Sequence, residues 1–291
     1  MRIIIFGYYI EVSKSYIDQV PPHYIRRQTL VGGERYVTPE IKEYESIILS
    51  TNSKIEDTEK KLFDQICIDI SSHLESLLKT SYAISLMDVF YSMAKVATER
   101  NYIKPYLNDS DTIDIKSGRH PVIEQIVGPG EFVPNDANLS NTKDQILLIT
   151  GPNMSGKSTY LRQVGILTLL AQIGSFIPAE SATIGIVDRI FTRVGLQDDL
   201  TKGQSTFMVE MLETAYILNQ ATSKSLIILD EIGRGTSTYD GLAIAQAVAE
   251  FIHEENSVSC KTLFATHYHE MTELSNYLRR ITNLHVSLSL I

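Results

Sequence analysis

Cysteine is scarce in this chain of 291 residues: only Cys67 and Cys260 are present, far apart in the sequence. A disulfide framework is not expected, and the default for such a chain is two buried, reduced thiols in a cytosolic protein. No pair of cysteine or histidine positions has the spacing of a metal site. The sequence therefore excludes the small disulfide-rich and zinc-ribbon classes.

Long apolar runs are also missing. No stretch approaches the roughly 18 consecutive apolar residues that a membrane span needs. The first six residues are too short for the apolar region of a signal peptide, and Gly7-Tyr8-Tyr9 does not resemble a cleavage site. The hydrophobic content of 43% is ample for a core, and the length suits one large or two modest domains. We expect a cytoplasmic protein without a membrane segment.

Basic residues are fewer than acidic ones. The chain has 26 Lys and Arg and 35 Asp and Glu, which gives a net charge of −9. A free-standing duplex-DNA binder is more often basic. Residues 1–37, however, have a balance of +2, which leaves −11 for the remainder. Any nucleic-acid contact should therefore lie near the N-terminus, where Arg26 and Arg27 follow Tyr24. The alternative for this pair is a solvated turn.

The most informative segment fits the pattern G-x-x-x-x-G-K-[ST], and it consists of Gly151, Pro152, Asn153, Met154, Ser155, Gly156, Lys157, Ser158 and Thr159. It follows an apolar run at 145–150 that predicts a buried strand, and it opens a segment with helical spacing. Glycines let backbone amides turn toward phosphate oxygens, and the helix N-terminus adds partial positive charge. We expect Lys157 to reach the β- and γ-phosphates of ATP and Ser158 to bind Mg²⁺, the only metal that we expect. A plain strand-to-helix turn is the alternative.

Two further apolar runs end in residues that suit nucleotide chemistry. Residues 225–229 lead to Asp230 and Glu231, and residues 262–266 lead to His267. Because the carboxyl ends of parallel strands face the ligand crevice, Asp230 would hold Mg²⁺ and Glu231 would polarise the attacking water as general base. A neutral His267 would donate to the γ-phosphate. An acidic strand end and a structural histidine are the alternatives, and the order of the motifs favours the nucleotide interpretation.

The chain divides into three parts by pattern. Residues 1–37 predict short strands, and residues 38–105 predict long helices that start at Thr38-Pro39. Apolar residues recur every seven positions at Ile41, Ile48, Ile55 and Leu62, which is typical of packing against another helix, with a bend near 71–72 or 79–81. From 145 onward strands and helices alternate, so residues 106–291 predict an α/β domain.

Distinctive segments follow one another in a characteristic order. They are residues 6–12 (FGYYIEV), 26–30 (RRQTL), 34–40 (ERYVTPE), 118–121 (GRHP), 151–159 (GPNMSGKST), 188–195 (DRIFTRVG), 204–211 (QSTFMVEM), 230–241 (DEIGRGTSTYDG) and 265–267 (ATH). Through them the chain resembles, over nearly its whole length, the C-terminal part of the MutS family of DNA mismatch-repair ATPases.

The resemblance implies an ABC-type P-loop ATPase domain at 106–291, preceded by lever helices at 38–105 and the end of a DNA clamp at 1–37. It implies ATP and Mg²⁺ as ligands, and a homodimer in which Ser205 acts on the nucleotide of the opposite subunit. From the residues alone, Ser205 would be a helix cap. Asn153 and residues 236–240 match the shared interface, and Phe132 matches the aromatic residue that stacks on adenine, although it could equally be a core residue.

The resemblance further implies contacts from Lys14, Arg26 and Arg27 to the backbone of double-stranded DNA, a downstream mismatch-repair partner, and a place in the bacterial cytoplasm at the nucleoid. The family's mismatch-reading domain is missing, and the chain stops at Ile291, shortly after 283–285 (NLH). We therefore expect a fragment or truncated product, an ATPase domain that is incomplete at its C-terminal end, and no discrimination of mismatches.

Other interpretations remain. The chain could be a nucleotide-binding or interaction module without efficient hydrolysis. An ABC transporter subunit would carry Leu-Ser-Gly-Gly-Gln in place of residues 204–211. The MutS paralogue with a nuclease tail is disfavoured, because that branch lacks the landmarks that this chain has around Arg26.

Overall fold

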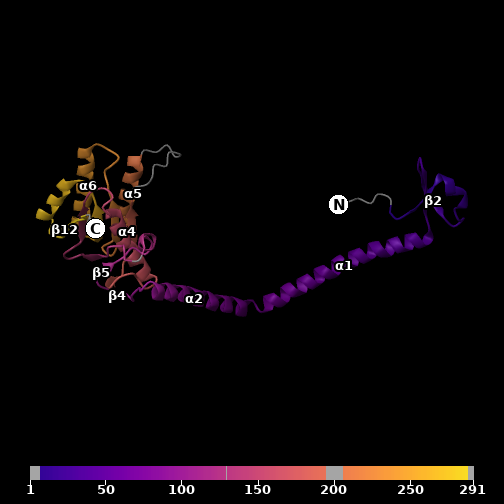
Figure 1. Ribbon diagram of the computed structural model, residues 1–291, viewed down its shortest axis with the longest axis horizontal. Helices are drawn as coiled ribbons and strands as arrows, with labels where there is room; N and C mark the ends of the chain where they lie inside the picture. The colour runs from indigo at the N-terminus through magenta and orange to yellow at the C-terminus, as the bar shows by residue number, and fades with distance from the viewer. Residues whose placement is uncertain (1–6, 129, 195–205, 288–291) are drawn as a thin grey trace. The chain divides into compact units, whose positions relative to one another are not determined.

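The computed structural model describes residues 7–128, 130–194 and 206–287 (Figure 1). Two units make up the chain, one ending at Leu86 and the other beginning at Met87. Among the described residues, every helix is either too short or too polar to cross a bilayer. The boundaries expected at 37 and 105 are not tested by this division and stay predictions.

The first unit opens with a small antiparallel sheet in the order β1-β3-β2. Its elements are β1 (Ile10–Ser13), the 3₁₀ helix η1 (Lys14–Gln19), β2 (Ile25–Thr29) and β3 (Gly33–Val37). Pairing of β2 with β3 shifts between Arg26 and Gln28, so Arg27 is the extra residue of a β-bulge. A bulge bends the strand and redirects the side chain at that position.

Two long helices follow, α1 (Pro39–Ser72) and α2 (Leu74–Glu99). The predicted start is confirmed, because the Thr38 hydroxyl oxygen accepts a hydrogen bond from the Ile41 amide at 3.2 Å and Pro39 begins the helix. The break at His73 confirms the first of the two predicted bends.

The apolar stripe of α1 differs from the expectation. Ile48, Ile55 and Leu62 are 41%, 50% and 60% exposed. A heptad stripe needs a covering helix, which residues 7–128, 130–194 and 206–287 do not supply. Cys67 is exposed on the same helix, so the expectation of two buried thiols is wrong for it, whereas Cys260 is buried. Burial raises the pKa of the Cys260 thiol to about 12.

The second unit is built on a parallel sheet in the order β12-β7-β11-β10-β9. Its strands are β7 (Ile146–Thr150), β9 (Ile190–Arg193), β10 (Leu226–Asp230), β11 (Lys261–Ala265) and β12 (Ile281–His285). All five residues of β7, β10 and β11 are buried, as expected for central strands covered on both faces.

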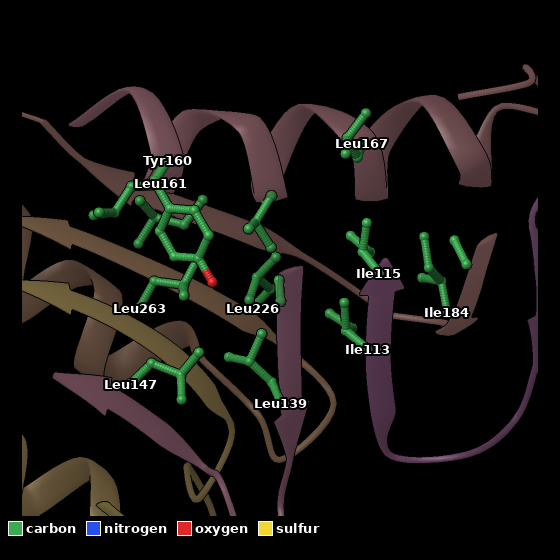
Figure 2. Close-up of a cluster of buried hydrophobic side chains, with 14 of the residues drawn as sticks. Ile113, Ile115, Leu139, Leu147, Tyr160, Leu161, Leu167, Ile184, Leu226 and Leu263 are labelled. Atoms are coloured by element: carbon green, nitrogen blue, oxygen red, sulfur yellow. The ribbon is translucent and has the colours of Figure 1, made fainter. Parts of the chain in front are cut away.

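Alternating side chains of these strands serve two cores. On one face, Leu147, Ile149 and Leu226 pack with α4 (Lys157–Gln172), as Figure 2 shows for Leu161 of that helix. On the other face, Ile146, Leu148 and Leu229 pack with three elements: α5 (Thr206–Gln220), α6 (Thr238–Glu254) and the 3₁₀ helix η2 (His269–Asn276). The alternation follows from the two-residue repeat of a strand.

A second sheet, in the order β4-β8-β5-β6, adds to the first core through Ile113, Ile115 and Ile184 (Figure 2). Its strands are β4 (Tyr106–Asn108), β5 (Thr112–Gly118), β6 (Asn135–Ser140) and β8 (Ser181–Gly185), and the short helix α3 (Ile123–Val127) lies between β5 and β6. The fold is thus mixed α/β, as the sequence predicts, with helix α4 and this sheet sharing one core.

Candidate functional site

The loop between β7 and α4 has a conformation that its glycines permit. Gly151 and Gly156 have φ of +150° and +100°, and a Cβ at Gly151 would lie 2.8 Å from the Val286 carbonyl oxygen. Only glycine fits the first position, and Gly156 forms the N-cap of α4. The Lys157 ammonium donates hydrogen bonds to the carbonyl oxygens of Gly151 at 2.8 Å and Pro152 at 3.0 Å. It is therefore held inside the loop.

The ends of β10 and β11 meet this loop. Asp230 pairs with Ala265 in the sheet, and the Glu231 amide donates to the Ala265 carbonyl oxygen at 3.0 Å. The Thr266 amide in turn donates to the carbonyl oxygen of Ile149 at 3.0 Å. Because the three strands are parallel neighbours, their carboxyl ends place all three predicted motifs at one edge of the sheet.

The Glu231 carboxylate contacts three basic side chains. One oxygen, Oε2, pairs with Arg234 Nη1 at 2.6 Å; the other, Oε1, lies 4.0 Å from Lys157 Nζ and against Nε2 of His267. The structure thus brings Lys157, Glu231 and His267 together. Sequence reasoning missed Arg234, for which the only signal was its position three residues after Glu231.

Glu231 also has an unusual backbone. Its φ is +63°, in the left-handed region that residues other than glycine rarely adopt. Such a conformation persists only where the surroundings hold it, and it is often found at functional sites.

Two buried side-chain oxygens near the loop have no hydrogen-bond partner among the described residues. These are Oδ1 of Asp230, whose residue is 7% exposed, and the hydroxyl oxygen of Ser155. Leaving a buried carboxylate oxygen without a donor is costly. A hard cation with oxygen ligands removes that cost, so Asp230 and the half-buried Ser158 at the start of α4 suit Mg²⁺. The free hydroxyl of Ser155 suits a phosphate oxygen.

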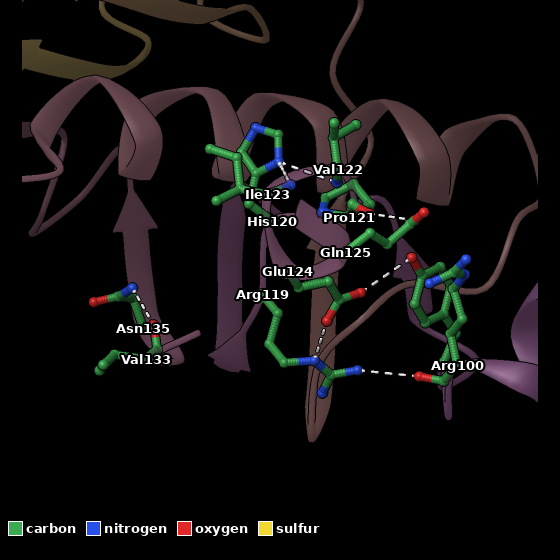
Figure 3. A network of polar contacts seen from close by, with 11 residues as sticks. Arg100, Arg119, His120, Pro121, Val122, Ile123, Glu124, Gln125, Val133 and Asn135 are labelled. Carbon is green, nitrogen blue, oxygen red and sulfur yellow. Dashed lines mark hydrogen bonds and ion pairs between the residues drawn. The ribbon is translucent and has the colours of Figure 1, made fainter. Parts of the chain in front are cut away.

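Phe132 is half-buried and lines a cavity with Arg100, Arg119 and Gln125. Figure 3 shows how this cavity is braced: Arg119 Nε binds Glu124 Oε2 at 2.7 Å, and its Nη2 donates to the Arg100 carbonyl oxygen at 3.3 Å.

The same carboxylate, Glu124, accepts a hydrogen bond from the Tyr102 hydroxyl at 3.3 Å. Burial, with the Glu124 charge, raises the pKa of Tyr102 to about 12. The hydroxyl therefore stays protonated and ties the segment after α2 to α3. Phe132 remains a predicted adenine contact.

The three predicted DNA contacts of the first unit have different surroundings. Arg26 pairs with Glu34 at 3.2 Å. Arg27 is exposed at the bulge, lines a polar cavity with Lys42, and forms no ion pair within the described chain. Lys14 is exposed at the start of η1. Arg27 and Lys14 are thus better placed than Arg26 to meet an external anion, and Lys42, which lines the Arg27 cavity together with Glu45, is a basic neighbour that sequence reasoning missed.

Two further residues, Asn153 and Ser205, are predicted to lie at the interface between the subunits of the dimer. Asn153 is exposed in the loop before α4. Ser205 lies outside the described residues, directly before α5.

Comparisons with known proteins match these two units to one class of protein. Residues 3–74 match the model of MutS family domain IV, and residues 147–290 match that of MutS domain V. The chain belongs to the MutS family.

Its relatives include proteins called DNA mismatch repair protein MutS. The one from Dehalococcoides mccartyi (strain CBDB1) is 53% identical over 285 residues, which are 98% of this chain and 33% of the relative. Those from Roseiflexus sp. (strain RS-1) and Acetivibrio thermocellus are each 56% identical over 283 residues, 97% of this chain and 26% and 32% of the relatives. The chain spans about a quarter to a third of the length of the relatives it matches.

Proposed function

We propose that residues 106–291 form an ABC-type P-loop domain that binds and hydrolyses ATP with Mg²⁺ as part of a DNA mismatch-repair protein. The observation that supports it best is the meeting of Lys157, Asp230, Glu231 and His267 at one sheet edge. Two carboxylates, an ammonium group and an imidazole, from the ends of β10 and β11 and the start of α4, thus converge at one place, and a cluster of this kind is costly to bury unless each charge is compensated.

Each residue has a role in the proposed hydrolysis. Glu231 orients the attacking water as general base, and Lys157 neutralises charge on the β- and γ-phosphates. Bound Mg²⁺, held by Ser158 and Asp230, would supply further neutralisation of phosphate charge. His267 donates to the γ-phosphate, and the backbone amides of residues 151–159 surround the phosphates, with Phe132 on the adenine.

Lys157 would exchange its present partners for phosphate oxygens. It now donates to two carbonyl oxygens of its own loop, at 2.8 and 3.0 Å. A phosphate oxygen carries far more negative charge than a carbonyl oxygen, so the exchange favours the ligand.

The partners that we propose for this chain are those expected of a MutS family member. We propose a homodimer in which Ser205, Asn153 and residues 236–240 contribute to the site of the opposite subunit. Residues 1–37 would contact the backbone of double-stranded DNA, with residues 38–105 as levers between clamp and ATPase. A downstream mismatch-repair protein and a cytoplasmic, nucleoid-associated location belong to the same proposal.

The test is the specific ATPase activity over a wide range of protein concentration, with Glu231→Gln as background. Loss of a general base lowers turnover by about 10²- to 10⁴-fold, while nucleotide affinity should persist. Activity per molecule that rises with concentration supports a composite site in a dimer. Equal turnover in the two proteins would remove Glu231 from the mechanism.

A second candidate is a nucleotide-binding module without efficient hydrolysis. The observation that favours it is the engagement of both Glu231 carboxylate oxygens, one by Arg234 and the other by His267, so that neither oxygen is free to accept a hydrogen bond from water without losing contact with one of these side chains. Nucleotide binding with turnover no higher than that of Glu231→Gln would support it.

A further inference from the structure

The turn that follows Glu231 is held by side chains of two other elements. The Gly233 amide donates a hydrogen bond to Glu210 Oε1 of α5 at 2.6 Å. The Gly233 carbonyl oxygen accepts one from the Tyr268 hydroxyl at 3.0 Å. Both backbone groups of this one residue are thus fixed, two residues away from Glu231.

Packing leaves this turn no room to move. A Cβ at Gly233 would lie 2.6 Å from the Gly241 carbonyl oxygen on α6, and a Cβ at Gly235 would lie 2.7 Å from Cβ of Phe207 on α5. Real Cβ atoms essentially never approach so closely. The turn is therefore seated directly against the first turns of both helices.

Glu210 has no role in the proposed chemistry, although it is charged and only 4% exposed. Burying a carboxylate is costly unless it is hydrogen-bonded, and the bond to the Gly233 amide is the kind of charge-assisted bond that offsets this cost. Tyr268 directly follows His267 in the chain. Burial, together with the nearby charge of Glu210, raises the pKa of Tyr268, so its hydroxyl remains a donor.

The left-handed backbone of Glu231 needs such support. Its φ of +63° is unfavourable for a residue with a side chain, and nothing in β10 itself requires it. The neighbouring turn, anchored at Gly233, restrains the chain on one side of Glu231, in addition to the hydrogen bond from the Glu231 amide to the Ala265 carbonyl oxygen.

We propose that Glu210 and Tyr268 are positioning residues that fix the turn at Gly233 and thereby hold the Glu231 carboxylate in place for ATP hydrolysis. This inference rests on the proposed function and deepens it. It also makes α5 a part of the hydrolytic machinery of its own subunit, through Glu210.

The test compares Glu210→Ala, Glu210→Gln and Tyr268→Phe with the wild-type chain. Glu213→Ala is the matched control, because Glu213 lies on the same helix and pairs with Arg193 at 3.1 Å, away from the turn. For each protein, kcat and KM for ATP, the affinity for a fluorescent ATP analogue and the thermal midpoint are measured. Glu231→Gln supplies the background.

Misplacing a reacting group by about 1 Å costs on the order of 100-fold in rate, so Glu210→Ala should lower kcat by roughly 10- to 100-fold. KM and analogue affinity should change by less than about twofold, since the residues that would bind ATP are untouched. Glu210→Gln keeps an acceptor oxygen and should recover most of kcat. Tyr268→Phe should lower kcat less than Glu210→Ala, and Glu213→Ala should keep the wild-type kcat.

Each other outcome overturns the inference. An unchanged kcat in Glu210→Ala would overturn it. A fall in kcat that is accompanied by a marked fall in both analogue affinity and thermal midpoint would also overturn it, because that combination indicates general damage to the fold. If Glu210→Ala does not fold, Glu210→Gln and Tyr268→Phe decide, and wild-type kcat in Tyr268→Phe counts against it. Wild-type turnover no higher than that of Glu231→Gln would instead refute the proposed hydrolysis, and the role of Glu210 with it.

Discussion

Replacing Gly233 by alanine tests how tightly the turn after Glu231 is held. Gly233 has φ of +91°, and its added Cβ would meet the carbonyl oxygen and Cα of Gly241 at 2.6 and 2.7 Å. Both contacts are with backbone, so no side chain can rotate away. The substitution therefore imposes two separate costs, one from the backbone angle and one from the collision.

A matched control separates these costs. Gly174, at the end of α4, has φ of +88°, but its Cβ would find no atom within 4 Å. The left-handed angle costs about 1–2 kcal/mol for alanine in both variants. The reduced entropy of the unfolded chain is also common to both. Overpacking adds about 1–3 kcal/mol at Gly233 alone.

We therefore expect Gly233→Ala to lower the free energy of unfolding by about 2–5 kcal/mol, and Gly174→Ala by about 1–2 kcal/mol. Urea unfolding followed by far-UV circular dichroism measures both, and it suits a chain without tryptophan. ATP turnover should fall further in Gly233→Ala than in Gly174→Ala. Equal unfolding midpoints for the two variants would refute the reasoning, because the collision would then cost nothing.

Two further predictions concern the first unit. Arg27→Ala should weaken binding to double-stranded DNA and reduce the slope of log K against log salt by about 0.9, the value for one lost phosphate contact, as measured by fluorescence anisotropy. Arg26→Ala, the control, should change the slope less because Arg26 is paired with Glu34; an equal change would contradict this. The Tyr36 hydrogen bond at 2.6 Å, followed by Arg26, holds the pKa of Glu34 below its usual 4.5. The carboxylate therefore stabilises the fold above pH 4.5 and loses this effect as the pH falls below it. Thermal midpoints should show that Glu34→Gln destabilises at pH 7 and less at pH 4, and a pH-independent difference would contradict the assignment.

The exposed apolar stripe of α1 matters for the solution measurements described above. Ile48, Ile55 and Leu62 recur at heptad spacing yet lie open to solvent within the described chain. Exposed apolar surfaces of this kind are typical of interaction sites and also favour aggregation.

Local patterns were enough to predict much of this protein. The apolar run at 145–150, the glycine loop and the helix from Lys157 could be predicted because strand, turn and helix depend on neighbouring residues. The same holds for the helix start at Thr38-Pro39 and for the strand that ends at Asp230. The mixed α/β class and the family landmarks were likewise readable from the chain itself.

Tertiary structure decided what these local elements do together. The order β12-β7-β11-β10-β9 brings His267 to Glu231, although the two residues follow different strands, β11 and β10. It also brings Glu210 of α5 to the Gly233 amide, a contact between residues 23 positions apart that no periodic pattern encodes. The bulge at Arg27, where the side chain is exposed, depends on how β2 pairs with β3. Sequence spacing specifies the neighbours along one element, whereas contacts across elements depend on sheet order and register, which only the folded chain defines.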